Sequence, residues 1–574
     1  MDPETPKPHT SRLTAGAVLL ARLKTVGVDY IFANSGTDFP PIIEGLAEAE
    51  AKGIDLPQAL VMPHENAAMG MAHGYYLATG RSQAVIAHTN VGLANCAIGA
   101  INAAVENIPV LLFSGRTPTI EKDRFGARTV PIGWGQEMRD QTALVREASK
   151  WDYELRFPEQ ALEIVDRAHA IANSMPRGPV YLSLPREVLC ETTPAEGLEI
   201  PPLMQPAIVH PSSAQIEQAA EILAEAENPV IFAQHGAGSA EAFAALTKLA
   251  DEWGIAICQY WALALAVPTD HPMSASSNPA KLIERADAIL VLDALAPWSP
   301  DAHRPAPGCR IIQMGQDPLK TRIPVRNFRS DLTVQCDVAD GILMLKAAMD
   351  RRRDRQDGKR AERWGRVAAE NAESRRIVLA AAEAGCGTAM SKEWVSLCLS
   401  RAVSGQDATI LSELGCPMAP MTLAHHRAWY QEPHAGGLGW SFPAALGMQL
   451  ADRDRLIVAT MGDGSYMFAN PVACHQIAEA LELPVVLLIV NNGEWGAVRQ
   501  SVLGVYPTGY AAKTNSMPLT QLSPVPDFVK VAEASRAWAC RVLDGEDLQQ
   551  ALQEAFTHVR KNRTLALLDV RVRP

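Results

Sequence analysis

Two polar turns, each at the end of a short apolar run, constrain the fold of this chain more than any other feature of its sequence. The apolar run 456–460 leads into Gly462-Asp463-Gly464-Ser465, and the run 485–490 leads into Asn491-Asn492-Gly493. Short apolar runs bounded by turn residues are typical of parallel strands covered on both faces, and the segment 473–483 between them has helical character. The sequence therefore predicts a strand–helix–strand unit with an Asp and an Asn side chain at the carboxyl ends of its strands, where open α/β sheets bind ligands.

The residue types in these turns suit a metal-bound phosphate group. The carboxylate of Asp463 and the amide oxygen of Asn492 are hard ligands for Mg²⁺, which completes its shell with phosphate oxygens and water. Glycines such as Gly464 allow a phosphate to approach the backbone closely. Either turn alone would be an ordinary loop, but both turns across one unit favour a site for a diphosphate and a divalent cation.

The composition describes a soluble globular protein of several domains. At 574 residues, 48% of them apolar, the chain is long enough for three or four domains of about 150 residues each. Its formal net charge of −12 argues against a nucleic acid or an anionic membrane as partner. The first five residues show no secretory signal, and the ten cysteines include no C-x-x-C pair. We therefore expect a cytoplasmic protein with reduced core cysteines rather than disulfides or a zinc site.

Strand-like and helical segments alternate in three blocks, which predicts three doubly wound α/β domains with parallel sheets. The expected boundaries are an N-terminal domain at 1–190, a central domain at 205–348 and a C-terminal domain at 388–574. A proline-rich link, 194–211, separates the first two, and the charge-dense segment 349–387 is expected to be an exposed helical linker. The other strand-like runs are 30–33, 84–87, 110–113 and 180–184 in the first domain and 230–233, 288–292 and 310–314 in the second.

Three further segments give the chain a family resemblance. They are Pro63-His64-Glu65-Asn66-Ala67-Ala68, Gly178–Pro185 and Gly436-Gly437-Leu438-Gly439-Trp440-Ser441-Phe442-Pro443. With the two turns, they resemble the thiamine-diphosphate (ThDP)-dependent enzymes of the 2-oxo-acid decarboxylase and acetohydroxyacid synthase superfamily, from Leu13 to the C-terminus. The Gly436 segment is closest in pattern to benzoylformate decarboxylases. The resemblance implies that the three domains are pyrimidine-binding (PYR), central and diphosphate-binding (PP) domains.

The resemblance assigns the two ends of the cofactor to separate groups of residues. Glu65 would hydrogen-bond a pyrimidine nitrogen and favour the imino tautomer that activates the cofactor. Mg²⁺ would be held by Asp463, Asn492 and the backbone carbonyl of Glu494. The cofactor would also contact Gly415, Gly464 and Ser465, the Gly436 carbonyl, and Leu438 as the wedge that bends it. The plain alternatives are a helix-dipole charge at Glu65 and a core leucine at Leu438.

His88 favours a decarboxylase within this superfamily. It follows Glu65 by 23 residues, as the catalytic histidine of benzoylformate decarboxylases follows their glutamate. Histidine titrates near neutral pH and can deliver a proton when an aldehyde is released, although a histidine that only satisfies a strand end is the alternative. The loop from Asn34 to Thr37 resembles the one that carries the active-site serine of those decarboxylases. Asn34 and Thr37 are therefore further catalytic candidates, with the Thr37 hydroxyl as a group that could bind a substrate carboxylate.

Other segments bear on the synthase alternative. Gln136-Glu137 resembles a Gln-Glu pair that acetohydroxyacid synthases place near the cofactor. Those synthases bind FAD through an arginine-containing turn, whereas the matching turn here, 293–300, has no arginine, so FAD is not expected. Benzoylformate decarboxylases use a second histidine from the central domain, and the sequence leaves open whether His303 takes that place.

These features predict ThDP- and Mg²⁺-dependent decarboxylation of a 2-oxo acid, with release of an aldehyde, carboligation, or both. The alternative is an acetolactate synthase-type carboligase that acts on pyruvate, and a third possibility is a non-catalytic ThDP-binding member. The resemblance implies a homodimer or homotetramer with active sites between chains and a small-molecule 2-oxo acid as partner. The identity of that acid stays open. The loops near Thr37, 495–503 and 506–522 would line its pocket, and their sequence does not give their conformation.

Overall fold

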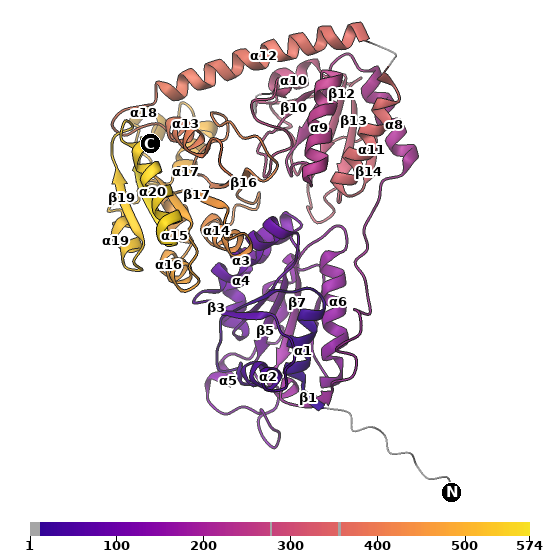
Figure 1. The fold of residues 1–574 in the computed structure, drawn as a ribbon, viewed down its shortest axis with the longest axis vertical. Helices are drawn as coiled ribbons and strands as arrows, with labels where there is room; N and C mark the ends of the chain where they lie inside the picture. Colours follow the sequence, from indigo (N-terminus) through magenta and orange to yellow (C-terminus); the bar gives the residue numbers. More distant parts are fainter. Residues whose placement is uncertain (1–11, 276–277, 354–356, 574) are drawn as a thin grey trace. The chain divides into compact units, whose positions relative to one another are not determined.

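Three parallel six-stranded sheets, each with helices packed against it, make up the described part of the chain (Figure 1). The computed structural model describes residues 12–275, 278–353 and 357–573. All strand pairs within the three sheets are parallel, and a short antiparallel pair joins β1 to β8. The predicted α/β fold with three doubly wound parallel sheets is confirmed.

The N-terminal sheet has the strand order β3-β2-β4-β5-β7-β6. Its strands are buried apolar runs, and β4 and β7 are buried along their whole length, as expected for strands covered on both faces. The elements are β1 (Arg12–Thr14), α1 (Ala15–Thr25), β2 (Tyr30–Ala33), α2 (Pro40–Ala51), β3 (Gln58–Val61), α3 (Glu65–Thr79), β4 (Ala84–Ala87), α4 (Thr89–Val105), β5 (Leu111–Arg116), α5 (Ile132–Gly135), β6 (Asp152–Glu154), α6 (Ala161–Asn173), β7 (Val180–Pro185), α7 (Arg186–Leu189) and β8 (Thr192–Pro194).

The central sheet has the order β11-β10-β9-β12-β13-β14, and the long helix α12 follows it. The elements are α8 (Ser213–Glu225), β9 (Pro229–Ala233), α9 (Ala240–Trp253), β10 (Ala256–Cys258), β11 (Ser274–Ala275), α10 (Ala280–Arg285), β12 (Ala288–Leu292), β13 (Arg310–Gly315), β14 (Leu332–Gln335), α11 (Val338–Asp350) and α12 (Asp357–Glu383).

The C-terminal sheet has the order β16-β15-β17-β18-β20-β19, which places the two strands of the opening motif, β17 and β18, side by side. The elements are α13 (Lys392–Val403), β15 (Ala408–Glu413), β16 (Trp429–Gln431), α14 (Ser441–Ala451), β17 (Leu456–Gly462), α15 (Asp463–Phe468), α16 (Pro471–Ala480), β18 (Val486–Asn491), α17 (Gly496–Val505), α18 (Tyr510–Thr514), α19 (Phe528–Glu533), β19 (Trp538–Val542), α20 (Leu548–Asn562) and β20 (Ala566–Arg571).

The described residues form two compact units that do not follow the order of the chain. The first unit contains residues up to 207 together with 433–452, and the second contains 208–432 together with 453 onward. The helix α14, which comes between strands of the C-terminal sheet in the sequence, therefore belongs to the unit of the N-terminal sheet. It packs there against α3 (Figure 1).

Glycines bring the backbones of α3 and α14 close together. A Cβ atom on Gly74 of α3 would lie 1.9 Å from the carbonyl oxygen of Ala444, and one on Gly447 of α14 would lie 2.1 Å from that of Met71. A side chain at either position would force the two helices apart. The close packing therefore fixes the loop before α14, which contains the predicted cofactor residues Gly436 and Leu438.

The charge-dense segment forms a helix that is exposed along most of its length, as predicted, but one of its faces is buried, which was not predicted. Arg363 of α12 is buried and donates hydrogen bonds to the backbone oxygens of Trp253 (3.1 Å) and Ala226 (2.8 Å). Burial lowers the pKa of Arg363 to about 10. The guanidinium group satisfies carbonyl groups at the ends of two helices of the central domain, so one face of α12 is part of that domain's structure.

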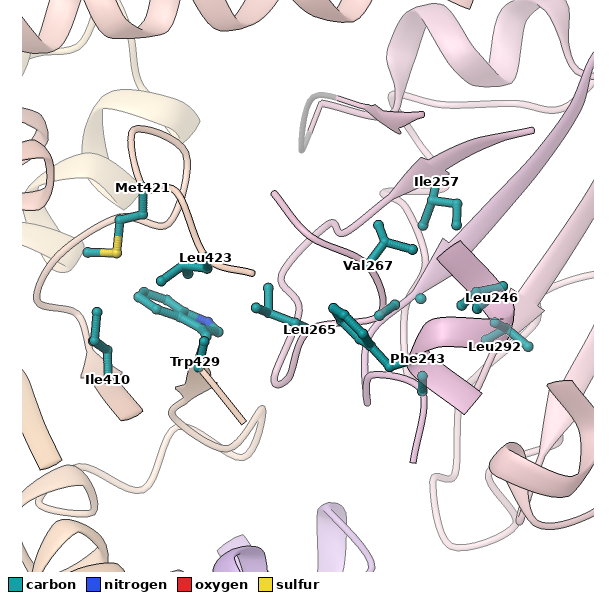
Figure 2. Close-up of a cluster of buried hydrophobic side chains, with 14 of the residues drawn as sticks. Phe243, Leu246, Ile257, Leu265, Val267, Leu292, Ile410, Met421, Leu423 and Trp429 are labelled. Atoms are coloured by element: carbon teal, nitrogen blue, oxygen red, sulfur yellow. The ribbon is translucent and has the colours of Figure 1, made fainter. Parts of the chain in front are cut away.

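The second unit has a continuous apolar core that includes residues of the central and C-terminal sheets. Figure 2 shows Leu265 and Phe243 of the central domain near Trp429, Leu423 and Met421, and all five side chains are buried. All ten cysteines are free, and seven of them are buried. Within the described residues, no helix is both long enough and apolar enough to cross a membrane.

Candidate active site

The two turns of the opening motif meet at the carboxyl edge of the C-terminal sheet. Strands β17 and β18 pair with Gly462 beside Val490, so the residues that follow each strand are neighbours. Asp463 begins α15 and accepts hydrogen bonds from the backbone nitrogens of Gly464 (2.9 Å, to Oδ1) and Gly493 (2.7 Å, to Oδ2). The Asp463 carboxylate therefore joins both turns. Its burial raises the pKa of Asp463, because a charged carboxylate loses hydration there.

The second turn supplies further oxygen atoms. Asn492 Oδ1 accepts a hydrogen bond from the Glu494 backbone nitrogen at 3.1 Å, and both residues are buried. Glu494 Oε1 is buried and has no hydrogen-bond partner among the residues that the structure describes, while Oε2 lies 3.5 Å from Arg499. An orphaned carboxylate oxygen and an Asp carboxylate held only by backbone donors are groups that a cation would stabilise.

The donor set at this edge fits a hard divalent cation that also binds phosphate. Among the described residues, no group of three or more His, Cys, Asp or Glu side chains could hold a metal. A cation at Asp463 would therefore take its other ligands from the Asn492 amide, backbone carbonyls and phosphate oxygens, as Mg²⁺ commonly does.

Two glycines of the predicted cofactor site are required by packing within the protein. A Cβ on Gly464 would lie 2.2 Å from the ring of Trp495, and a Cβ on Gly415 would lie 2.5 Å from the backbone of Thr460. Ser465, next to Gly464, is buried. The absence of a side chain lets Trp495 pack against the turn at Gly464, and lets the segment at Gly415 pack against the backbone of β17.

A group of ionisable side chains that the sequence analysis missed lies behind this edge. The Lys392 ammonium group donates a hydrogen bond to the Leu414 carbonyl (2.9 Å), and burial lowers the pKa of Lys392. The carboxyl group of Glu432 accepts from the Leu414 backbone nitrogen (3.4 Å). Burial, and then the nearby charge of Glu413, raise the pKa of Glu432 to about 8. These residues come from separate segments, so no local pattern marks them.

In the first unit, Glu65 begins α3 after the N-cap residue His64 and is buried. Its Oε2 accepts a hydrogen bond from the Asn95 side chain of α4 at 3.0 Å. A Cβ on Gly92 would lie 2.7 Å from Glu65 Oε1, so glycine at that position makes room for the carboxyl group. Glu65 is thus a fixed, buried carboxyl group rather than a solvated charge at a helix end.

Helix α4 also holds the segment that precedes α14. The side chain of Asn102 donates to the Gly437 carbonyl (2.9 Å) and accepts from the Gly437 nitrogen (3.1 Å). Asn95 and Asn102 are seven residues apart, so they lie on one face of α4. Gly436 has a φ of +67°, which favours glycine, and the neighbouring Leu438 is half-buried. One face of α4 therefore binds both Glu65 and the loop that contains Gly436 and Leu438.

His88 lies in a series of polar contacts that the sequence analysis did not predict, although it singled out both His88 and Gln136. Its Nδ1 contacts Oδ1 of the buried Asp38, and its Nε2 is 2.9 Å from the side-chain nitrogen of Gln136. The hydrogen bond to Asp38 raises the pKa of His88, and the charges of Asp38 and Glu65 act in the same direction against the effect of burial. Asp38 was not predicted, although it follows Thr37 in the loop already singled out.

The other two catalytic candidates of that loop have different surroundings. The Asn34 side chain donates to the Met62 carbonyl at 2.8 Å. Thr37 is exposed, and its backbone oxygen accepts a hydrogen bond from Arg186 at 3.3 Å. Since β2 and β4 are neighbours in the sheet, the residues after β2 lie at the same edge as His88.

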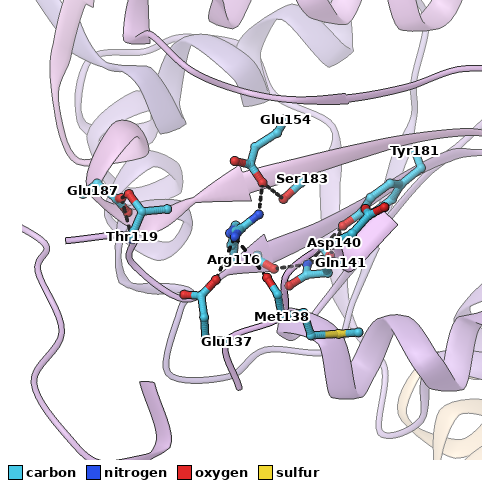
Figure 3. Close-up of polar contacts among 12 residues, drawn as sticks. Arg116, Thr119, Glu137, Met138, Asp140, Gln141, Glu154, Tyr181, Ser183 and Glu187 are labelled. Carbon is cyan, nitrogen blue, oxygen red and sulfur yellow. Dashed lines mark hydrogen bonds and ion pairs between the residues drawn. The ribbon is translucent and has the colours of Figure 1, made fainter. Parts of the chain in front are cut away.

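Ion pairs fix the loop that carries Gln136. Figure 3 shows Arg116, at the end of β5, between Glu137 (2.7 Å) and Glu154 (2.5 Å). Arg128 also pairs with Glu137. Strand β5 is longer than the predicted run 110–113, because its polar end, up to Arg116, continues the ladder with β7. These contacts hold Gln136 beside His88.

A cavity of about 900 Å³ lies in the second unit, a size that suits a small molecule. Its lining includes Trp261, His271, Arg375 and Met418, and Met418 follows Gly415 by three residues. His303, the candidate for a second histidine, does not line this cavity, whereas His271 does.

The chain matches the sequence models of three domains of one enzyme family, the thiamine pyrophosphate enzymes (TPP is another name for ThDP). The N-terminal TPP binding domain matches residues 13–144, the central domain matches 216–345, and the C-terminal TPP binding domain matches 415–570. The chain belongs to the thiamine pyrophosphate enzymes. Its Glu65 lies within the first of these matches and its Asp463 within the last.

Relatives of this thiamine pyrophosphate enzyme include both classes considered above. It is 25% identical to the acetolactate synthase of Mycobacterium bovis, over 95% of this chain and 86% of the relative. It is 26% identical to a probable 2-ketoarginine decarboxylase of Pseudomonas aeruginosa, over 94% of this chain and 90% of the relative. The fold is similar to that of the 4-hydroxybenzoylformate decarboxylase of Rhodococcus jostii, with a TM-score of 0.77, 23% identity, and coverage of 98% of this chain and 99% of that one.

Proposed function

We propose that this enzyme decarboxylates a 2-oxo acid with thiamine diphosphate and Mg²⁺, and releases an aldehyde or passes the acyl group to an acceptor. The choice of a decarboxylase rests on the contact between His88 and Asp38, because this hydrogen bond raises the pKa of His88. Such a group can hold a proton near neutral pH and deliver it when the carbon–carbon bond breaks.

The proposed cofactor contacts follow the residues described above. Asp463, Asn492 and the Glu494 carbonyl would hold Mg²⁺, with Gly415, Gly464 and Ser465 near the diphosphate. Glu65, Gly436 and Leu438 would contact the other end, where the buried Glu65 carboxyl group can share a proton with a ring nitrogen. When bound, thiamine diphosphate supplies an electron sink for the loss of CO₂.

The remaining residues would act on the substrate. His88 would give its Nε2 proton to the carbon that has lost CO₂, while Asn34 and the Thr37 hydroxyl would orient the substrate carboxylate. We further propose a homodimer or homotetramer with its active sites between chains, no FAD, and a cytoplasmic location in keeping with the free cysteines.

An assay of separate 2-oxo acids tests this proposal. Purified enzyme with thiamine diphosphate and Mg²⁺ would be given benzoylformate, 2-ketoarginine and pyruvate in turn, and CO₂, aldehyde and acetolactate would be measured. We expect CO₂ and aldehyde from at least one of the first two acids, and a loss of about 100-fold or more in Glu65→Gln. Glu44→Gln, at an exposed site of the same domain, is the matched control. Unchanged turnover in Glu65→Gln would contradict the role of this carboxyl group.

The second candidate is an acetolactate synthase-type reaction, which is favoured by the Mycobacterium bovis relative and by the position of Gln136 beside His88. Formation of acetolactate from pyruvate, without turnover of the two larger acids, would support this alternative and reject aldehyde release. A protein that binds thiamine diphosphate but turns over none of the three acids would favour the non-catalytic alternative.

A further inference from the structure

Asp38, His88 and Gln136 form a continuous polar chain at the carboxyl edge of the N-terminal sheet. Asp38 lies in the loop after β2, His88 follows β4, and Gln136 follows α5. The contacts are Asp38 Oδ1 to His88 Nδ1 and His88 Nε2 to Gln136 Nε2, so both ring nitrogens have defined neighbours. The backbone nitrogen of Thr89 donates to the other Asp38 oxygen at 3.3 Å.

Two glycines, which have no side chain, create the space for this series of polar contacts. A Cβ on Gly36 would lie 2.1 Å from His88 Nδ1, and a Cβ on Gly115 would lie 1.5 Å from Asp38 Oδ2. Neither glycine has a positive φ, so space rather than backbone conformation explains glycine at both positions. Strand β5 and the loop after β2 therefore leave the space that the Asp38 and His88 side chains occupy.

The chemistry of the three side chains fixes the place of the proton. An ionised Asp side chain can only accept hydrogen bonds, so His88 Nδ1 must carry a hydrogen. The Gln136 amide has both a donor and an acceptor, and can therefore face Nε2 whether that atom is bare or protonated. Gln136 can follow a change of protonation at Nε2, while Asp38 keeps Nδ1 protonated throughout.

We propose that Asp38 is a positioning residue that locks His88 with a hydrogen on Nδ1, so that Nε2 alone exchanges protons with the substrate, and that Gln136 occupies Nε2 until the substrate replaces it. This inference rests on the proposed decarboxylase function. In the reaction the Nε2–H bond of the imidazolium breaks as CO₂ leaves, its proton forms the new C–H bond, and the neutral ring keeps its Nδ1 hydrogen. A proton from water then restores the imidazolium, so one proton is consumed for each CO₂ released.

The charged groups around His88 support this arrangement. Asp38 and Glu65 both favour the imidazolium form. On the loop that carries Gln136, the neighbouring Glu137 is paired with Arg116 and Arg128. Among the described residues, Asp38 and Glu65 therefore supply the negative charge that acts on His88.

The Asp38→Asn variant tests the inference, because it keeps the shape of the side chain and removes its charge. In protein labelled with ¹⁵N-histidine and free of cofactor, the nitrogen shifts of His88 report both its pKa and its tautomer. We expect wild-type His88 to carry its neutral-state hydrogen on Nδ1, and we expect Asp38→Asn to lower its pKa by about one pH unit or more. Asp140→Asn, which removes an exposed carboxylate paired with Arg146, should leave both unchanged.

Turnover gives a second readout. The pH profile of kcat in Asp38→Asn should move to lower pH with KM little changed. Gln136→Glu should slow turnover, because its carboxylate would accept a hydrogen bond from Nε2–H and so retain that hydrogen on the ring. A neutral wild-type His88 with its hydrogen on Nε2, or an unchanged His88 pKa in Asp38→Asn, would overturn the inference. If no 2-oxo acid is turned over, the proposed function fails while the nitrogen shifts still decide the role of Asp38. If Asp38→Asn does not fold, the wild-type tautomer alone decides it.

Discussion

At the scale of single residues, the surroundings decide which side chains titrate near neutral pH. Burial lowers the pKa of His73 and of His475 to about 4, so both stay neutral. His88 differs from them because the hydrogen bond to Asp38 raises its pKa. All three are histidines near the starts or interiors of helices, and only the contacts in space separate the ionisable one from the neutral ones.

The raised pKa of Glu432 predicts a measurable change in the free energy of unfolding with pH. Its pKa in the folded protein is about 8, above the ordinary value for glutamate, because burial and Glu413 disfavour the charged form. A raised folded pKa means that the stabilisation is fully present below the unfolded pKa and is lost as the pH rises through about 8. We expect unfolding of the second unit to become easier between pH 5 and pH 9, by on the order of 2–4 kcal/mol.

Glu432→Gln should remove that pH dependence, since the amide resembles the protonated acid. The measurement is the urea midpoint of the wild type and the variant at several pH values, with Glu221→Gln at an exposed site as control. Parallel pH curves for Glu432→Gln and the wild type would show that Glu432 ionises normally.

At the scale of elements, the packing of α3 against α14 shows how two helices far apart in sequence form one unit. Gly70, Gly74 and Gly447 remove side chains from the contact, so that backbone meets backbone, and Pro443 packs against Gly70. The same contact joins the helix that begins with Glu65 to the helix that follows Leu438. The position of two predicted cofactor residues therefore depends on helix packing rather than on either helix alone.

A pair of glycine substitutions tests this contact. Gly74→Ala should destabilise the first unit by about 1–3 kcal/mol, because its Cβ would meet the Ala444 carbonyl oxygen. Gly365→Ala in α12, where a Cβ would have no neighbour within 4 Å in the described part of the chain, should instead stabilise its helix by about 0.5–1 kcal/mol. Hydrogen exchange of α3 and α12 amides measures both effects, and faster exchange of α3 in Gly74→Ala is the expected sign. Equal protection of α3 in Gly74→Ala and wild type would mean that the helices can separate without loss.

At the scale of the whole molecule, binding of the cofactor should raise the free energy of unfolding. A ligand that binds only the folded protein stabilises it by about 2.7 kcal/mol at 100 times its dissociation constant. We expect thiamine diphosphate with Mg²⁺ to raise the thermal midpoint of the wild type, and EDTA to reverse most of that rise. Asp463→Asn should reduce the rise, while Asp301→Asn, at an exposed site, should not. A full rise in Asp463→Asn would place the cation elsewhere.

The sequence by itself determined the fold class, the cofactor family and several of the buried strands. The runs 30–33, 84–87 and 288–292 coincide with β2, β4 and β12, because an apolar run between turn residues is a local property that the chain carries wherever it folds. The family resemblance rested on equally local motifs, such as the turns around Asp463 and Asn492.

Only the tertiary structure decided which side chains face one another. Asp38 meets His88 because β2 and β4 are neighbours in the sheet, and Asn102 holds Gly437 across 335 positions of sequence. The buried face of α12 and the carboxyl group of Glu432 depend in the same way on segments that pack from elsewhere. Local patterning fixes where an element forms, whereas the pKa of a group and its partner depend on charges and burial supplied by distant parts of the chain.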